Sequence, residues 1–172
     1  DQSDLFQAAG NTTAALNSLQ QAMDLFDSDG ASSAASGCRL RIADMLVLSG
    51  DLGKARRTFE TLIDEAFNSQ SKAAGGLPCY LLRFRAGLCY LADGQPEQLE
   101  AAIESWAEED MSFAQSDVYE RLRSLLDALV NSDEDAFNKL VRAMGDNAGT
   151  DRVVTSLLLK TKKALVRQGD AG

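Results

Sequence analysis

The sequence predicts an all-α protein, a right-handed α-solenoid built from antiparallel helix pairs. Apolar residues recur at spacings of three and four along most of the chain, which is the pattern of one buried helical face. β-branched residues are sparse and no segment alternates with period two, so strands are not expected. Two prolines, Pro78 and Pro96, occur in 172 residues, which permits long helices. We expect about nine helices in a single domain, 1–172.

Turn residues and caps delimit the expected helices. The stretch "SDGA" (28–31) predicts a turn, and "NSQSKAAGG" (68–76) is the longest linker. The glycines of "GDNAG" (145–149) end one helix, and Thr150 or Asp151 is expected to cap the next. The expected helices cover residues 2–9, 12–27, 32–49, 51–67, 78–92, 96–109, 115–130, 133–144 and 151–167.

A helix–turn–helix unit recurs along the chain. Its turn residues are Gly10, Gly50, Gly94 and Asn131, at spacings of 40, 44 and 37 residues. A pair of amphipathic helices cannot bury its apolar face alone, so such units stack, as in tetratricopeptide solenoids. An irregular helical bundle is the alternative. Apolar residues follow each turn residue at the fifth, ninth and twelfth positions: Ala15, Leu19, Ala22; Ala55, Phe59, Leu62; Leu99, Ile103, Trp106; and Ala136, Leu140, Ala143.

Few residues could support catalysis. The chain has no histidine, which excludes Ser–His and Cys–His pairs and leaves no ordinary zinc site. The stretch "GDLGK" (50–54) lacks the glycine spacing and the Ser/Thr of a phosphate loop, so it is interpreted as a turn. The glutamates of 97–108 recur at helical spacing and are interpreted as a solvated face. We therefore expect no enzyme, no cofactor, no metal and no small-molecule substrate.

Charge and hydropathy restrict the expected partners and location. A net charge of −9 argues against nucleic-acid binding. No apolar run approaches the roughly 20 residues of a membrane span, and "DQSDLFQAAG" at the start lacks a signal-peptide pattern. The three widely spaced cysteines indicate reduced thiols, so we expect a cytoplasmic protein. The basic stretch 155–168 is expected to be the closing helix, with contact to a membrane surface as an alternative.

The charges are distributed unevenly. Residues 93–135 hold 13 acids and two bases, a net of −11, whereas residues 136–172 hold three acids and seven bases. The acidic segment could steer a basic partner protein towards it, or could serve solubility alone. Arginine pairs recur two residues apart, as Arg39 with Arg41 and Arg83 with Arg85, on the expected first helices of two pairs. Because first helices line the concave side of a solenoid, these bases could meet an acidic helical partner. Simple solvation is the alternative for some of them, and Arg83 and Arg85 cannot both face one groove.

An ordered series of stretches resembles α-type soluble NSF attachment proteins. "GCRLRIADMLVLSGDLGKARRTFETL" (37–62) is similar to a helix pair of that family with a cysteine-containing first helix. "FRAGLCYLADG" (84–94) resembles the next helix, and "YERLRSLLDAL" (119–129) resembles an acidic, leucine-rich one. "TDRVVTSLLLKTKKAL" (150–165) is similar to the closing helix. The resemblance covers nearly the whole chain, which looks like the C-terminal half to two thirds of a family member.

The resemblance implies an adaptor that binds SNARE complexes and recruits the AAA ATPase NSF to disassemble them in vesicle fusion. It implies that Arg41, with Arg39 as a weaker second, meets the SNARE complex. It also implies peripheral association with membranes through these partners. A generic tetratricopeptide-like scaffold with another helical or peptide partner is the alternative. The residues expected to face the ATPase are Asp127, Glu108, Glu109 and Asp110.

Several positions depart from the family pattern. Gly37 and Tyr80 stand where the family has basic residues, and Asp117 replaces an arginine. On the acidic, leucine-rich helix Asp127 is retained, while Val130 and its neighbour Asn131 replace acids. The chain ends in "QGDAG" in place of the family's acidic, leucine-containing tail. These differences bear on both SNARE affinity and ATPase stimulation.

Overall fold

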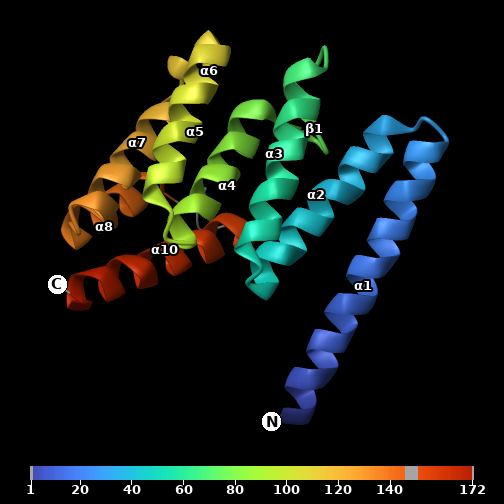
Figure 1. Cartoon of the computed structure of the whole chain (residues 1–172), viewed down its shortest axis with the longest axis horizontal. Helices are drawn as coiled ribbons and strands as arrows, with labels where there is room; N and C mark the ends of the chain where they lie inside the picture. The colour runs from blue at the N-terminus through green and yellow to red at the C-terminus, as the bar shows by residue number, and fades with distance from the viewer. Residues whose placement is uncertain (1, 146–150, 172) are drawn as a thin grey trace. The chain divides into compact units, whose positions relative to one another are not determined.

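The computed structural model describes residues 2–145 and 151–171, and these are mostly helical, as predicted (Figure 1). Nine helices and one short β-hairpin make up the part of the chain that the structure describes. The chain forms two compact units, Asp1–Cys79 and Tyr80–Gly172. That both belong to one right-handed solenoid domain stays a prediction.

The first unit is built on three helices, and neighbours along the chain pack against each other. Helix α1 (Gln2–Ser28) packs on α2 (Ser32–Ser49), and α2 packs on α3 (Leu52–Asn68). Figure 1 shows that they run alternately up and down. Gly50 ends α2 with a φ of 91°, a left-handed conformation that glycine adopts at low cost, and Asp51 caps α3. The predicted α2–α3 turn is therefore confirmed.

The turn predicted at Gly10 is wrong, because α1 continues through it as one helix from Gln2 to Ser28. A glycine inside a helix costs only about 1 kcal/mol relative to alanine, so it does not end a helix that a neighbour supports. The two helices expected over 2–9 and 12–27 are thus a single one.

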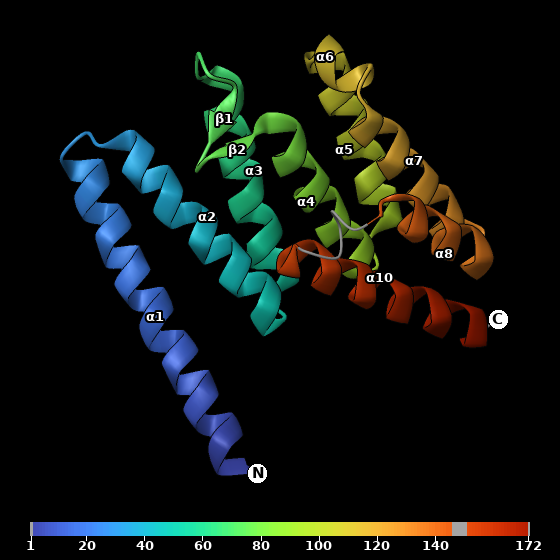
Figure 2. The same cartoon turned by 180° about the vertical axis from the view of Figure 1, so that it is seen from behind.

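The segment expected to be the longest linker, 68–76, holds the first strand and the turn of a short β-hairpin (Figure 2), so the expectation of no strands is wrong at this point. Strand β1 (Ala73–Ala74) pairs antiparallel with β2 (Leu77–Pro78) across Gly75 and Gly76, whose φ values are 61° and 85°. A two-residue turn with both φ values positive matches the right-handed twist of the strands. A Cβ on Gly75 would lie 2.9 Å from the Cβ of Leu40, so the hairpin fits closely against α2.

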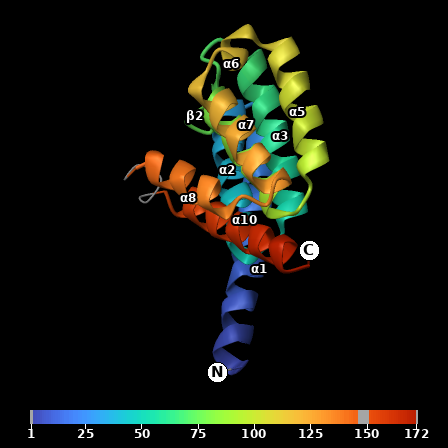
Figure 3. The same cartoon turned by 90° about the vertical axis from the view of Figure 1, so that its left-hand side faces the viewer.

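The second unit contains six described helices: α4 (Cys79–Ala92), α5 (Pro96–Glu109), α6 (Met111–Ala114), α7 (Asp117–Val130), α8 (Glu134–Ala143) and α10 (Arg152–Ala171). Helix α5 packs on α7, α7 on α8, and α8 on α10 (Figures 1 and 3). The short α6 was not predicted. It follows α5 directly, because Asp110 is both the last cap of α5 and the first cap of α6. Asp151 caps α10 as predicted, while the alternative cap, Thr150, lies outside the described residues.

The predicted repeat holds best in the middle of the chain. The fifth, ninth and twelfth positions after Gly50 and after Gly94 are all buried. The corresponding positions after Gly10 and after Asn131 are half-buried or exposed. The burial predicted for these two helix–turn–helix repeats was therefore too high. At the last turn Ser132, with a φ of 51°, takes the left-handed conformation beside Asn131.

Candidate interaction surfaces

The two arginines of α2 differ in their surroundings. Arg41 is exposed and makes no ion pair within the described part of the chain. Arg39 is half-buried and forms an ion pair with Glu65 of α3, with Asp27 of α1 at 3.7 Å. The Ser36 hydroxyl donates to the other oxygen of Glu65 at 2.7 Å. Arg39 therefore ties three helices together, and Arg41 is the member of the pair that faces solvent.

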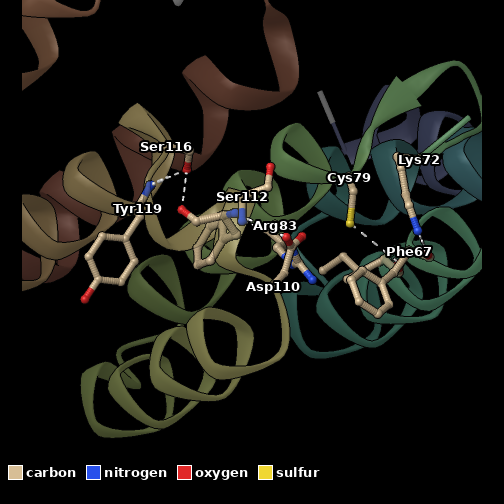
Figure 4. Close-up of polar contacts among 10 residues, drawn as sticks. Phe67, Lys72, Cys79, Arg83, Asp110, Ser112, Ser116 and Tyr119 are labelled. Atoms are coloured by element: carbon tan, nitrogen blue, oxygen red, sulfur yellow. Dashed lines mark hydrogen bonds and ion pairs between the residues drawn. The ribbon is translucent and has the colours of Figure 1, made fainter.

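The two arginines of α4 are both buried within the second unit. Arg83, 1% exposed, donates from Nη1 to Asp110 at 2.5 Å (Figure 4) and lies over the Phe113 ring. Arg85, 9% exposed, donates from Nη2 to Asp151 at 2.8 Å. For this pair the suggested contact with an acidic partner and the alternative of solvation are both wrong, because internal carboxylates cover both guanidinium groups.

Each aspartate that receives an α4 arginine also caps a helix. One oxygen of Asp110 accepts Arg83, and the other accepts the backbone N–H groups of Ser112 and Phe113, which begin α6. Asp151 accepts Arg85 on one oxygen and caps the first turn of α10 with the other. The α4 arginines thus fix the starts of two helices, a role that charge-assisted hydrogen bonds suit.

The pKa of Asp110 lies below its ordinary value. Burial alone would raise the pKa, but the hydrogen bond and the positive charge of Arg83, together with the backbone N–H groups of Phe113 and Ser112, outweigh it. Asp110 is therefore held as a carboxylate between a buried cation and a helix start, and it is less accessible than the other acids expected to meet the ATPase.

The remaining acids of residues 93–135 lie on the surface. Twelve of the 13 are exposed, and Asp110 is the exception. Glu108 and Glu109 end α5, while Asp127 stands on α7 beside a hollow of about 390 Å³ between α7 and α8. The predicted solvated face of α5 is confirmed, since the glutamates of 97–108 are exposed while Leu99, Ile103 and Trp106 are buried.

Arg123 is half-buried within this acidic surface. Its Nε donates to the Tyr119 hydroxyl at 3.3 Å, and Glu100 and Glu104 each lie 3.9 Å from its guanidinium. The hydrogen bond to Tyr119, and then the two carboxylates, raise the pKa of Arg123 above its ordinary value. One arginine thus draws α5 and α7 together, while most of the negative charge stays available to a partner.

Two further properties concern sites of other kinds. Within the described residues, no three side chains of the metal-ligating types come together as a cation site. Among the helices of those same residues, none combines the length and the apolar character that crossing a bilayer would need.

Comparison with known proteins identifies the family. The family model "Soluble NSF attachment protein, SNAP" matches residues 1–166. The chain belongs to the soluble NSF attachment protein family. The resemblance in the sequence is thereby confirmed, and family members form helical solenoids, in keeping with the helix pairs of both units.

Curated relatives of this family match almost the whole chain. A "Probable vesicular-fusion protein sec17 homolog" of Schizosaccharomyces pombe is 32% identical over 99% of this chain and 58% of its own length. An "Alpha-soluble NSF attachment protein" of Vitis vinifera is 25% identical over 94% of this chain and 55% of its own length, and that of Dictyostelium discoideum is 26% identical over 98% and 57%. The chain therefore spans a little more than half the length of these relatives.

The sequence did not show which charged residues form buried ion pairs within the chain. Arg83 and Arg85 have the same spacing as Arg39 and Arg41, and Asp110 looks like its acidic neighbours Glu108 and Glu109. One available signal was the position of Asp110 and Asp151 just before helical stretches, because a capping aspartate is already committed to backbone N–H groups. Their pairing with α4 had no local signal.

Proposed function

We propose that the chain is a vesicle-fusion adaptor that binds SNARE complexes and recruits an NSF-type AAA ATPase, without chemistry of its own. The observation that carries the proposal is the family match over residues 1–166. Relatives named for vesicular fusion and for NSF attachment support it. On this proposal the chain works in the cytoplasm and meets membranes through its partners. A generic helical scaffold is the competing function.

We propose Arg41 as the contact to the SNARE complex in this chain. It is exposed on α2, and replacing it would disturb no ion pair of the described residues. Arg39 stays the weaker candidate, because it would have to exchange Glu65 and Asp27 for carboxylates of the partner. An ion pair at a partly desolvated interface contributes on the order of 1–3 kcal/mol.

We propose Asp127, with Glu108 and Glu109, as the side that faces the ATPase. All three are exposed, and the field of a segment with a net charge of −11 would speed the approach of a basic domain. Asp110 is the weaker candidate here, because Arg83 and the start of α6 already use both of its oxygens.

The test uses two binding partners and matched charge reversals. Arg41→Glu should weaken binding of an assembled SNARE complex, while Arg121→Glu, an exposed reversal on α7, should not. Asp127→Lys should slow association of the ATPase N-domain, while Asp29→Lys, in the turn after α1, should not. The association rate should also fall as salt rises, since physiological salt screens charges over about 8 Å. Failure of both partners to bind the wild-type chain would leave the scaffold as the better function, and binding that ignores Arg41 and Asp127 alike would remove these two assignments.

A further inference from the structure

A groove between α8 and α10 differs in character from the acidic surface of the same unit. It encloses about 510 Å³, and the residues that line it lie on the two facing helices, apart from Gly145, which follows α8. On α10 they are Thr155, Leu158, Leu159 and Lys162, the i, i+3, i+4, i+7 series that marks one helical face. A face of this kind normally packs against another helix.

The floor of the groove is apolar. Phe137 and Val141 come from α8, and Leu158 and Leu159 come from α10. Leu159 is 57% exposed, although it is a large apolar side chain beside three others. An apolar groove between two helices is the usual seat of an amphipathic helix, which inserts side chains spaced at i, i+3 and i+7.

The rim of the groove is basic. Arg142 is exposed on α8, Lys162 borders the groove on α10, and none of the lining residues is acidic. This is unusual in a chain of net charge −9, but residues 136–172 hold seven of its 17 bases and three of its 26 acids. The charge of the rim therefore favours an occupant that has carboxylates flanking its apolar side chains.

From the apolar floor and the basic rim, we propose that the α8–α10 groove binds an acidic amphipathic helix of a partner protein. Leucine or phenylalanine side chains of that helix fill the space beside Leu159, and its glutamates or aspartates pair with Arg142 and Lys162. The surface goes beyond the proposed adaptor function, because it uses neither Arg41 nor the exposed carboxylates around Asp127.

The probe is a fluorescein-labelled helical peptide with leucines at i, i+3 and i+7, glutamates beside them and alanines elsewhere, titrated with the whole chain and followed by anisotropy. Arg142→Glu and Leu159→Ser should each weaken binding about tenfold, or about 1.4 kcal/mol. The matched controls are Arg121→Glu, with the same charge change, and Val130→Ser, at an apolar residue 59% exposed on α7. Neither control should alter binding.

Folding does not confound the test, because Arg142 and Leu159 are exposed and circular dichroism melting checks each variant. The proposal is overturned if the peptide does not bind, or if the controls weaken it as much as the groove variants do. Phosphatidylserine vesicles serve as a second probe. Vesicle binding that depends on Leu159, with no peptide binding, would also overturn it in favour of a membrane contact.

Discussion

Helices α2 and α4 carry the same arginine pattern 44 residues apart, yet they use it differently. In α2 one arginine is half-buried and the other, Arg41, is exposed. In α4 both arginines are buried, and each holds an aspartate. The difference lies in the elements that pack against each helix, because the caps of α6 and α10 supply carboxylates to α4. An acidic cap comes to each α4 arginine, whereas no described carboxylate pairs with Arg41.

The comparison extends to the small residues beside the arginines. Ala43 of α2 and Gly87 of α4 are also 44 residues apart, and Ala43 is fully buried. A Cβ on Gly87 would lie 2.6 Å from Leu122 Cδ2 of α7. Helix α4 is thus packed more closely than α2 at the same position, in keeping with its more complete burial.

The largest effect is expected at Arg83. Replacing Arg83 by alanine removes a buried cation from Asp110 and should lower the free energy of unfolding by about 3–5 kcal/mol. Arg121→Ala, at an exposed arginine of α7, should change it by less than about 0.5 kcal/mol. Urea unfolding followed by circular dichroism measures both. A loss below about 1 kcal/mol for Arg83→Ala would contradict the structural role of this ion pair.

The same ion pair predicts a pH effect. Because the pKa of Asp110 is lowered in the folded chain, its contribution to stability is present above the unfolded value near 3.8 and is lost as pH falls through the folded pKa. Wild type should therefore lose stability more steeply on acidification than Asp110→Asn, which has no carboxyl at this position. Urea midpoints measured at neutral pH and through the acid range test this, and equal slopes for the two chains would refute it.

Gly87→Ala should have an intermediate effect. The added Cβ must displace Leu122, and overpacking of this kind costs about 1–3 kcal/mol. If Leu122 is the cause, then Leu122→Ala should be tolerated better in the Gly87→Ala background than alone, and a double-mutant cycle shows this coupling. Simple additivity of the two changes would exclude a direct clash.

The smallest expected change in the free energy of unfolding concerns the two arginines of α2, which should differ in their response to replacement by alanine. Arg39→Ala should lower the free energy of unfolding by about 1 kcal/mol, because a partly exposed ion pair is worth little. Arg41→Ala should leave it unchanged within about 0.5 kcal/mol. Thermal melts of the two variants decide the matter. Equal losses would mean that α2 uses both arginines structurally, as α4 does.

Much of the fold could be predicted from the sequence. The helices after Gly50 and Gly94 follow from apolar spacing and from glycines that the chain needs in a left-handed conformation. Gly10 misled the prediction, because a glycine alone does not distinguish a turn from a supported helix. The pair Gly75–Gly76 was a usable hairpin signal that the prediction assigned to a linker.

The candidate surfaces were less predictable, for a physical reason. Burial of Arg85 depends on Asp151, which lies 66 residues beyond it. Helical periodicity is a local property and contains no information on such a distant pairing. The basic groove had a partial signal in the excess of bases after residue 135, but its apolar floor required α8 and α10 to be placed side by side.

The distance between Arg85 and Asp151 has a consequence for the order of events during synthesis. A ribosome adds about 5–20 residues per second, so roughly 3–13 s separate the two residues at the peptidyl transferase centre. Until the aspartate emerges, a buried Arg85 guanidinium would lack the ion pair with Asp151, which is costly. We therefore expect the second unit to complete its core only after the start of α10 has left the ribosome.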